Sequence, residues 1–108
     1  MKYLMLLAID ENVVVDPAEM DPRAWDEEMT RRGVVTVKER LTQVADSTTV
    51  KVREGEVLIA DGPFAETKEQ IGGFCLLECA DLDEAIEVAA QHPVARFGTM
   101  ELRPLYYQ

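Results

Sequence analysis

The most constraining feature of the chain is the apolar run Tyr3–Ile9 (YLMLLAI), which follows Lys2 and ends at Asp10. Interpreted as a strand over Lys2–Ile9, it is apolar on both of its alternating faces. Such a strand has to be covered on both sides, because an uncovered face would leave its apolar side chains in water. The segment Phe74–Cys79 (FCLLEC) has the same two-sided character. A fold for this chain must therefore cover both faces of its sheet.

Length and charge limit what the protein can be. With 108 residues, of which 47% are hydrophobic, one globular domain over residues 1–108 is expected. Asp and Glu number 21 against 11 Lys and Arg, which gives a formal net charge of −10. Nucleic acids and anionic membranes are bound by cationic surfaces, so neither is an expected partner. The first apolar run is too short for a secretory signal or a membrane helix, and a cytoplasmic protein is expected.

A first amphipathic helix is expected near residue 22. Asp21 is suited to be its N-cap, Pro22 to be its first residue, and Gly33 to end it. Trp25 and Met29 are one turn apart, so they form the stripe that faces the core.

A second helix is expected after the Cys-containing strand. The segment Asp81–Glu84 (DLDE) has the pattern of a capping box, and Pro93 marks the helix end. The apolar face of this helix is expected to be formed by Leu82, Ala85, Ile86 and Ala89.

Strands account for most of the remaining chain. Besides the first, the expected strands are Gly33–Val37, Thr48–Arg53, Glu56–Ala60, Phe74–Cys79 and Thr99–Arg103. The second and third of these form a hairpin that pairs Arg53 with Glu56, Val52 with Val57 and Val50 with Ile59. The polar segment Lys38–Ser47 is expected to be mostly loop.

This order of elements predicts an α+β, ferredoxin-like antiparallel sheet with two helices and an inserted hairpin. Two helices can cover one face of such a sheet. Since the first strand is apolar on both faces, the second face needs a cover of its own. We therefore expect a homodimer in which the sheets of two copies pack face to face.

The stretch Asp61–Phe74 (DGPFAETKEQIGGF) resembles the signature of the DGPF-domain proteins, a branch of the YCII-related family. Similarity continues at Met1–Tyr3, at Asp83–Ala85 and between His92 and Pro104, so it extends over most of the chain. The resemblance implies a dimeric α+β barrel and a small bacterial protein linked to extracytoplasmic-function sigma factors.

The resemblance also implies a site residue. In relatives, the aspartate that Asp61 matches is paired with a histidine near the end of the first strand. This sequence departs from that pattern, because the corresponding stretch Ala8–Asn12 (AIDEN) has no histidine. A catalytic role here would therefore depend on Asp61 without the family's histidine.

The residues around Asp61 allow two interpretations of its role. It ends a strand and precedes Gly62 and Pro63, and a residue before proline is expected to be extended. Its carboxylate could face a cleft and act as a general base or as a hydrogen-bond acceptor for a ligand. Alternatively, it is a turn residue that accepts hydrogen bonds from the N–H groups of Ala65 and Glu66.

Four further residues are candidates for ligand binding. Phe64 could form an apolar wall, Lys68 could supply a cation, and Arg96 and Arg103 could hold an anion with their guanidinium groups. Each also has a structural interpretation: a core anchor for Phe64, a solvated loop for Lys68, and ion pairs with neighbouring acids for the arginines. His92 is the only histidine; it precedes a proline at a helix end and is expected to cap or to lie at the surface.

No cofactor or metal is expected. Cys75 and Cys79 lie four residues apart in a strand, roughly 13 Å, which is beyond the reach of a disulfide. They are interpreted as buried thiols, because a metal site would need more cysteines or histidines at ligand spacing. The pair Gly72-Gly73 lacks the spaced glycines and the lysine of a phosphate-binding loop.

Three functions remain open from the sequence. The first is a small dimeric binding module in which Asp61 and the adjacent loop line a pocket near the dimer interface, and which acts with a sigma factor as a regulator or sensor. The second is a cofactor-free enzyme that uses Asp61 as its base. The third is an interaction protein in which this loop serves only dimerisation.

Overall fold

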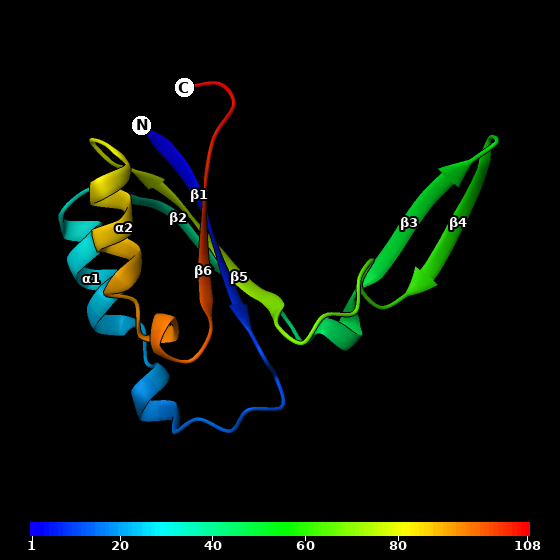
Figure 1. Ribbon diagram of the computed structural model, residues 1–108, viewed down its shortest axis with the longest axis horizontal. Helices are drawn as coiled ribbons and strands as arrows, with labels where there is room; N and C mark the ends of the chain where they lie inside the picture. Colours follow the sequence, from blue (N-terminus) through cyan, green and yellow to red (C-terminus); the bar gives the residue numbers. More distant parts are fainter.

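A four-stranded antiparallel sheet, two helices and a separate hairpin make up the fold in a computed structural model that describes all 108 residues (Figure 1). The strands are β1 (Lys2–Ile9), β2 (Val35–Arg40), β3 (Thr48–Arg53), β4 (Glu56–Asp61), β5 (Gln70–Glu78) and β6 (Thr99–Pro104). The helices are α1 (Arg23–Arg31) and α2 (Leu82–Ala90), and short 3-10 turns are η1 (Pro17–Met20), η2 (Val44–Asp46) and η3 (Pro93–Arg96).

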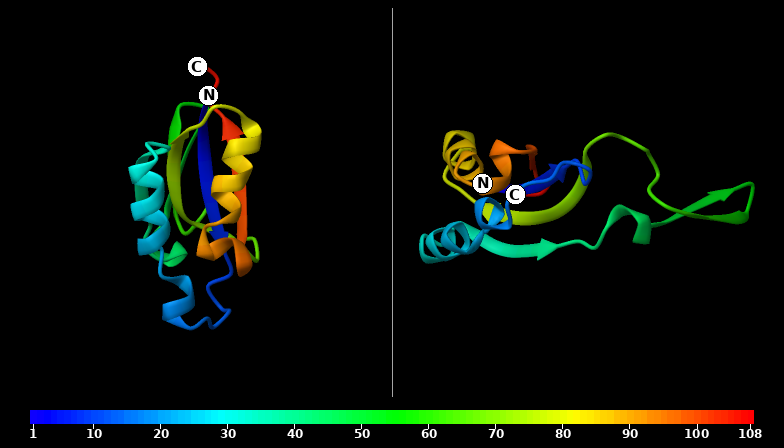
Figure 2. Two further views of the ribbon diagram at one scale, coloured as in Figure 1. Left: turned by 90° about the vertical axis from the view of Figure 1, so that its left-hand side faces the viewer. Right: turned by 90° about the horizontal axis from the view of Figure 1, so that it is seen from below.

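The sheet has the strand order β2-β5-β1-β6, and all of its neighbours are antiparallel. Both helices lie on one face of it (Figure 2). The ferredoxin-like α+β arrangement is therefore confirmed. The two strands that are apolar on both faces, β1 and β5, are the two central strands of this sheet.

The core lies between the sheet and the helices. Its buried residues are Tyr3, Met5, Trp25, Met29, Val34, Cys75, Leu77, Cys79, Ala85, Val88 and Ala89. Trp25 and Met29 face the core from α1, as predicted. The indole Nε1 of Trp25 donates a hydrogen bond to the carbonyl oxygen of Val88 at 2.9 Å, so α1 and α2 are joined by a polar contact inside an apolar core.

The first helix begins one residue later than its sequence pattern indicates. Pro22 occupies the cap position, and the side chain of Asp21 accepts a hydrogen bond from the backbone N–H of Arg23 at 3.0 Å. Asp21 thus satisfies a free N–H of the first turn although it stands just outside the helix. Gly33 follows the helix with φ +74°, a conformation that favours glycine and ends the helix there.

The capping box of the second helix is present. Asp81 accepts a hydrogen bond from the N–H of Glu84, and the Glu84 carboxylate accepts one from the N–H of Ala80. The predicted apolar face is only partly correct: Ala85 and Ala89 are buried, and Val88 is buried with them, but Leu82 and Ile86 are half exposed. The buried side of α2 is thus formed by Ala85, Val88 and Ala89, and the two larger residues lie on its exposed side. No helix of the fold has the length and apolarity to cross a membrane.

The largest error of the sequence prediction concerns β2. The segment Lys38–Ser47 was expected to be mostly loop, but β2 continues through Lys38, Glu39 and Arg40, and η2 follows it. Glu39 pairs with Phe74 and Arg40 with Gly73. Polar residues can form this part of the strand because β2 is an edge strand and its side chains are exposed to solvent.

The hairpin has the predicted register, with Val52 opposite Val57 and Val50 opposite Ile59. It does not join the main sheet, however, but forms a two-stranded sheet of its own. It projects from the side of the molecule opposite the helices (Figure 1).

The second face of the main sheet is covered by nothing in this chain (Figure 2). Its central pairs are Leu4 with Leu76 and Leu6 with Phe74, and all four side chains are half-buried. We call this surface the open face. It is the face for which the sequence predicts a second copy.

Candidate functional site

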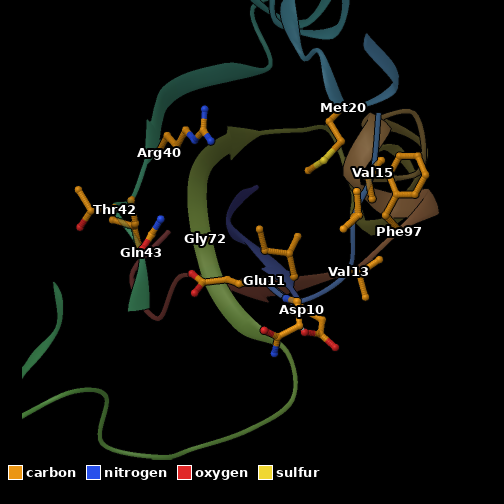
Figure 3. A pocket seen from close by; sticks show the side chains of 14 residues that line it. Asp10, Glu11, Val13, Val15, Met20, Arg40, Thr42, Gln43, Gly72 and Phe97 are labelled. Atoms are coloured by element: carbon orange, nitrogen blue, oxygen red, sulfur yellow. Dashed lines mark hydrogen bonds between the residues drawn. The ribbon is translucent and has the colours of Figure 1, made fainter. Parts of the chain in front are cut away.

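The larger of the two main cavities lies at the end of β1 (Figure 3). Its volume is about 570 Å³. The loop that follows β1 forms much of its wall. The opposite wall is formed by Arg40 at the end of β2, by the loop after it, and by Gly72 near the start of β5. Met20 and Phe97 lie on one side of it and Arg40 lies on the other.

The loop after β1 is held by its own carboxylates. Asp10 Oδ1 accepts a hydrogen bond from the backbone N–H of Asn12 at 2.9 Å. Glu11 Oε2 accepts one from the backbone N–H of Val44 at 3.1 Å. Both carboxylates of the cavity wall are therefore engaged with backbone donors.

Arg40 is the cation of this cavity. It is the last residue of β2, and its guanidinium group makes no hydrogen bond and no ion pair in the structure. A guanidinium group presents several N–H donors in a planar fork that matches a carboxylate. The unpaired N–H donors of Arg40 thus face the apolar wall of the cavity.

Two glycines allow the chain to pack closely beside the cavity. A Cβ on Gly98 would overlap the carbonyl oxygen of Ala8, so only glycine fits where β6 approaches β1. A Cβ on Gly72 would lie 3.2 Å from Cδ1 of Ile9, which also lines the cavity. Gly72 is the residue skipped where the pairing of β1 with β5 shifts register.

A smaller cavity of about 360 Å³ adjoins the first. The loop residues Asp10, Glu11 and Asn12 line both cavities, so they form the wall between them. The other side of the smaller cavity is formed by the two segments that connect the hairpin to the sheet, and it includes Gly62 and Lys68.

Asp61 lies at the end of β4, opposite Thr48, and its carboxylate is exposed. It lines neither of the two main cavities, although Gly62 and Pro63 line the smaller one. The predicted turn contacts with the N–H groups of the following loop are not formed, because no hydrogen bond reaches this carboxylate.

Gly62 differs from the expected extended conformation. Its φ is +98°, in the region that favours glycine. Its N–H donates a hydrogen bond to the carbonyl oxygen of Ser47 at 2.7 Å, and its own carbonyl oxygen accepts one from Thr49 Oγ1 at 2.8 Å. The glycine of this motif therefore closes the base of the hairpin, an interaction that outweighs the preference imposed by Pro63.

The four candidate ligand-binding residues do not lie together. Lys68 lines the smaller cavity. Phe64 is 87% exposed, lines neither cavity and is not a core anchor. Arg96 donates a hydrogen bond to the backbone carbonyl of Glu19 and lies over the ring of Phe97.

Arg103, on β6, forms an exposed ion pair with Glu101 at 2.7 Å, which agrees with its structural interpretation. Sequence analysis missed Arg40 because it placed this residue in a loop. Its signal would have been the continuation of the second strand past Val37 to Arg40, which the polar residues of an edge strand conceal.

His92 is a capping residue, as one of the two alternatives predicted, but it is buried rather than on the surface. Its Nδ1 accepts a hydrogen bond from the backbone N–H of Val94 at 3.1 Å, and its ring contacts Trp25 edge to face. Burial lowers the pKa of His92, and the charge of Asp26 opposes that shift. A neutral ring is the form that can accept the Val94 bond.

Cys75 and Cys79 are both free and buried, as expected for strand thiols. Burial raises the pKa of the Cys75 thiol to about 11, and burial also raises the pKa of Cys79. Neither sulfur lies in the two main cavities. No group of three or more His, Cys, Asp or Glu side chains is arranged to hold a metal ion.

Comparison with known proteins assigns the sequence to a family. Residues 1–107 match the YCII-related domain. The chain belongs to the YCII-related family. It is also 46% identical over 68 residues to an uncharacterized protein from Rhizobium meliloti (strain 1021), an alignment that covers 61% of this chain. The chain spans 55% of the length of that relative.

The stretch Ala8–Asn12, where the resemblance implies a histidine in relatives, supplies Asp10, Glu11 and Asn12 to both cavities. The residues directly after Asp61 face the same smaller cavity. In this member of the family, carboxylate and amide side chains therefore occupy the region in which the resemblance expects an imidazole.

Proposed function

We propose that this protein is a small homodimeric module that binds a small molecule with an apolar body and a carboxylate group. The site is the larger cavity, with Arg40 as the anchor of the carboxylate. The observation that carries the proposal is the free guanidinium of Arg40 across the cavity from an apolar wall formed by Met20 and Phe97.

The hydrogen bonding within the cavity favours this ligand class. Asp10 and Glu11 accept hydrogen bonds from backbone N–H groups, so their charges are partly satisfied within the protein. Arg40 has no such partner. A ligand carboxylate would form two parallel hydrogen bonds to it, while the apolar part of the ligand leaves water for the wall of valines and Met20. The volume of about 570 Å³ is within the usual range for small-molecule sites.

The homodimer is supported by the open face of the sheet. Leu4, Leu6, Phe74 and Leu76 form an apolar surface there, and a second sheet packed against it would complete a dimeric α+β barrel. A regulatory link to extracytoplasmic-function sigma factors belongs to the proposal through the family resemblance alone.

A thermal-shift experiment with matched acid and amide pairs tests the ligand class. Phenylacetate and phenylacetamide have the same apolar body, but only the acid can bind the guanidinium as an anion. We expect phenylacetate and related aromatic acids to raise the Tm of the wild-type protein in a concentration-dependent manner, and the amides to have little effect. Arg40→Gln should remove the response to the acids.

Arg53→Gln is the matched control, because Arg53 lies at the exposed turn of the hairpin, away from the cavity. It removes the same charge and should respond to the acids as the wild type does. Equal stabilisation of the Arg40→Gln protein by the acids, or equal responses to acid and amide, would contradict the assignment of Arg40.

A further inference from the structure

The hairpin formed by β3 and β4 (Thr48–Asp61), here called the arm, makes no contribution to the core of its own chain. It forms a separate two-stranded sheet and has no strand contact with the main sheet. All residues of β4, and all of β3 except Thr49, are exposed. An isolated two-stranded hairpin is marginally stable in water, so a structure of this kind needs a surface to pack on.

The two faces of the arm differ in chemistry. Residues that pair directly across an antiparallel ladder share a face, so one face carries the pairs Val50–Ile59 and Val52–Val57. These four side chains are between 58% and 69% exposed. The opposite face carries the pairs Lys51–Leu58 and Arg53–Glu56 and is largely polar. The arm is therefore amphipathic, and its apolar face is uncovered.

The arm and the open face lie on the same side of the molecule. The helices cover one face of the main sheet, and the arm projects beyond the other (Figures 1 and 2). A second copy whose sheet covers the open face would therefore also stand beside the arm. Two-fold symmetry then places the arm of each copy beside the other copy.

The dimensions of the chain agree with this arrangement. Its radius of gyration is 15.8 Å, whereas a compact chain of this length has about 13 Å. Its accessible surface is 7762 Å², against about 6,000 Å² for a compact monomer of this size. The excess of about 1,800 Å² is more than the roughly 800 Å² that each partner buries in a standard interface.

We propose that the arm is a dimerisation arm, whose apolar face (Val50, Val52, Val57 and Ile59) packs against a second copy of this chain. The inference rests on the homodimer proposed above and adds a second contact to its sheet-to-sheet interface. Both segments that connect the arm to the sheet line the smaller cavity, at Ala45 and Gly62 among others. Docking of the arm on the partner therefore holds one wall of that cavity in place.

Two neighbouring residues of β4 provide a matched test. Ile59 and Leu58 are both apolar, but they lie on opposite faces of the arm. Ile59→Lys and Leu58→Lys introduce the same charge at adjacent positions. The dissociation constant of the dimer is measured by sedimentation equilibrium for the wild type and both variants, and circular dichroism verifies that each is folded.

If the arm docks on the partner, Ile59→Lys should raise the dissociation constant of the dimer about tenfold or more. Leu58→Lys should change this constant about twofold or less. Hydrogen exchange supplies a second measurement: amides of β3 and β4 should be protected in the wild-type dimer and exchange faster in the Ile59→Lys protein.

A wild-type dimer that both variants leave unchanged, or weaken equally, overturns the role of the arm but leaves the sheet-to-sheet dimer standing. A wild-type protein that is monomeric at all concentrations overturns both. Neither result depends on Arg40, so binding of phenylacetate to each variant separates this proposal from that of the ligand site.

Discussion

Glu11 and Val44 are joined by a hydrogen bond in which the backbone N–H of Val44 donates to Glu11 Oε2 at 3.1 Å. Glu11 belongs to the loop after β1 and lines both cavities, whereas Val44 begins η2 at the base of the hairpin. The bond therefore connects the wall shared by the two cavities to the segment that carries the hairpin.

Removal of this acceptor should loosen the base of the hairpin. In Glu11→Ala the N–H of Val44 loses its partner, and its hydrogen exchange should become several-fold faster. Glu11→Gln retains an oxygen acceptor and should lie close to the wild type. Unchanged exchange at Val44 in the alanine variant, measured by NMR, would show that this bond does not order the segment.

Gly98→Ala should destabilise the fold by about 1–3 kcal/mol, because a Cβ at this position overlaps the carbonyl oxygen of Ala8 and backbone must move. Gly72→Ala is the matched control. Its Cβ would contact the flexible side chain of Ile9, which can move aside, so the loss should be clearly smaller. Urea denaturation measures both, and equal losses would contradict this assignment of the tighter contact.

Asp61 and Asp81 should differ in their contributions to stability. The side chain of Asp81 accepts a hydrogen bond from the N–H of Glu84 and caps α2, so Asp81→Ala should cost about 1 kcal/mol. The carboxylate of Asp61 accepts no hydrogen bond in the chain, and Asp61→Ala should leave Tm nearly unchanged. A large loss on Asp61→Ala would indicate a contact made in the dimer.

His92 should make stability sensitive to mildly acidic pH. Burial lowers the pKa of His92 in the folded state below the ordinary value of 6.5. The unfolded chain then binds more protons at this site, so the stability is fully present above about pH 6.5 and is lost as the pH falls toward the folded pKa. Tm should therefore decrease between about pH 7 and pH 5, where most carboxylates are still ionised.

His92→Asn is the control for this effect. Asparagine can accept the hydrogen bond from Val94 that His92 accepts, but it does not titrate. Its Tm should depend less on pH over the same range. A pH dependence equal to that of the wild type would assign the acid sensitivity to other groups.

Much of this fold follows from local patterns. The two-sided apolar character of Tyr3–Ile9 predicted a strand that has to be covered on both faces, and the pairing of Val50 with Ile59 followed from a two-residue turn. These features depend on residues that are close in sequence or on the alternation of a single strand. The capping box at Asp81 is of the same kind.

The candidate site depends on relationships that no local pattern contains. Arg40 enters the cavity because β2 continues along β5, and this pairing depends on Phe74 and Gly73, more than thirty residues later in the chain. The conformation of Gly62 follows from its contacts with Ser47 and Thr49 across the hairpin. Tertiary contacts override the local preferences of both segments.

The central claim is that a carboxylate ligand binds beside Arg40, and a titration of the ¹⁵N-labelled protein with phenylacetate, followed by NMR, tests it most directly. Chemical-shift changes should concentrate at the Nε–H of Arg40 and at the backbone amides of Ile9–Val15, Leu41 and Phe97, all of which belong to the larger cavity. Changes that cluster instead at Gly62–Gln70, or that leave the Arg40 signal in place at saturation, would contradict the claim.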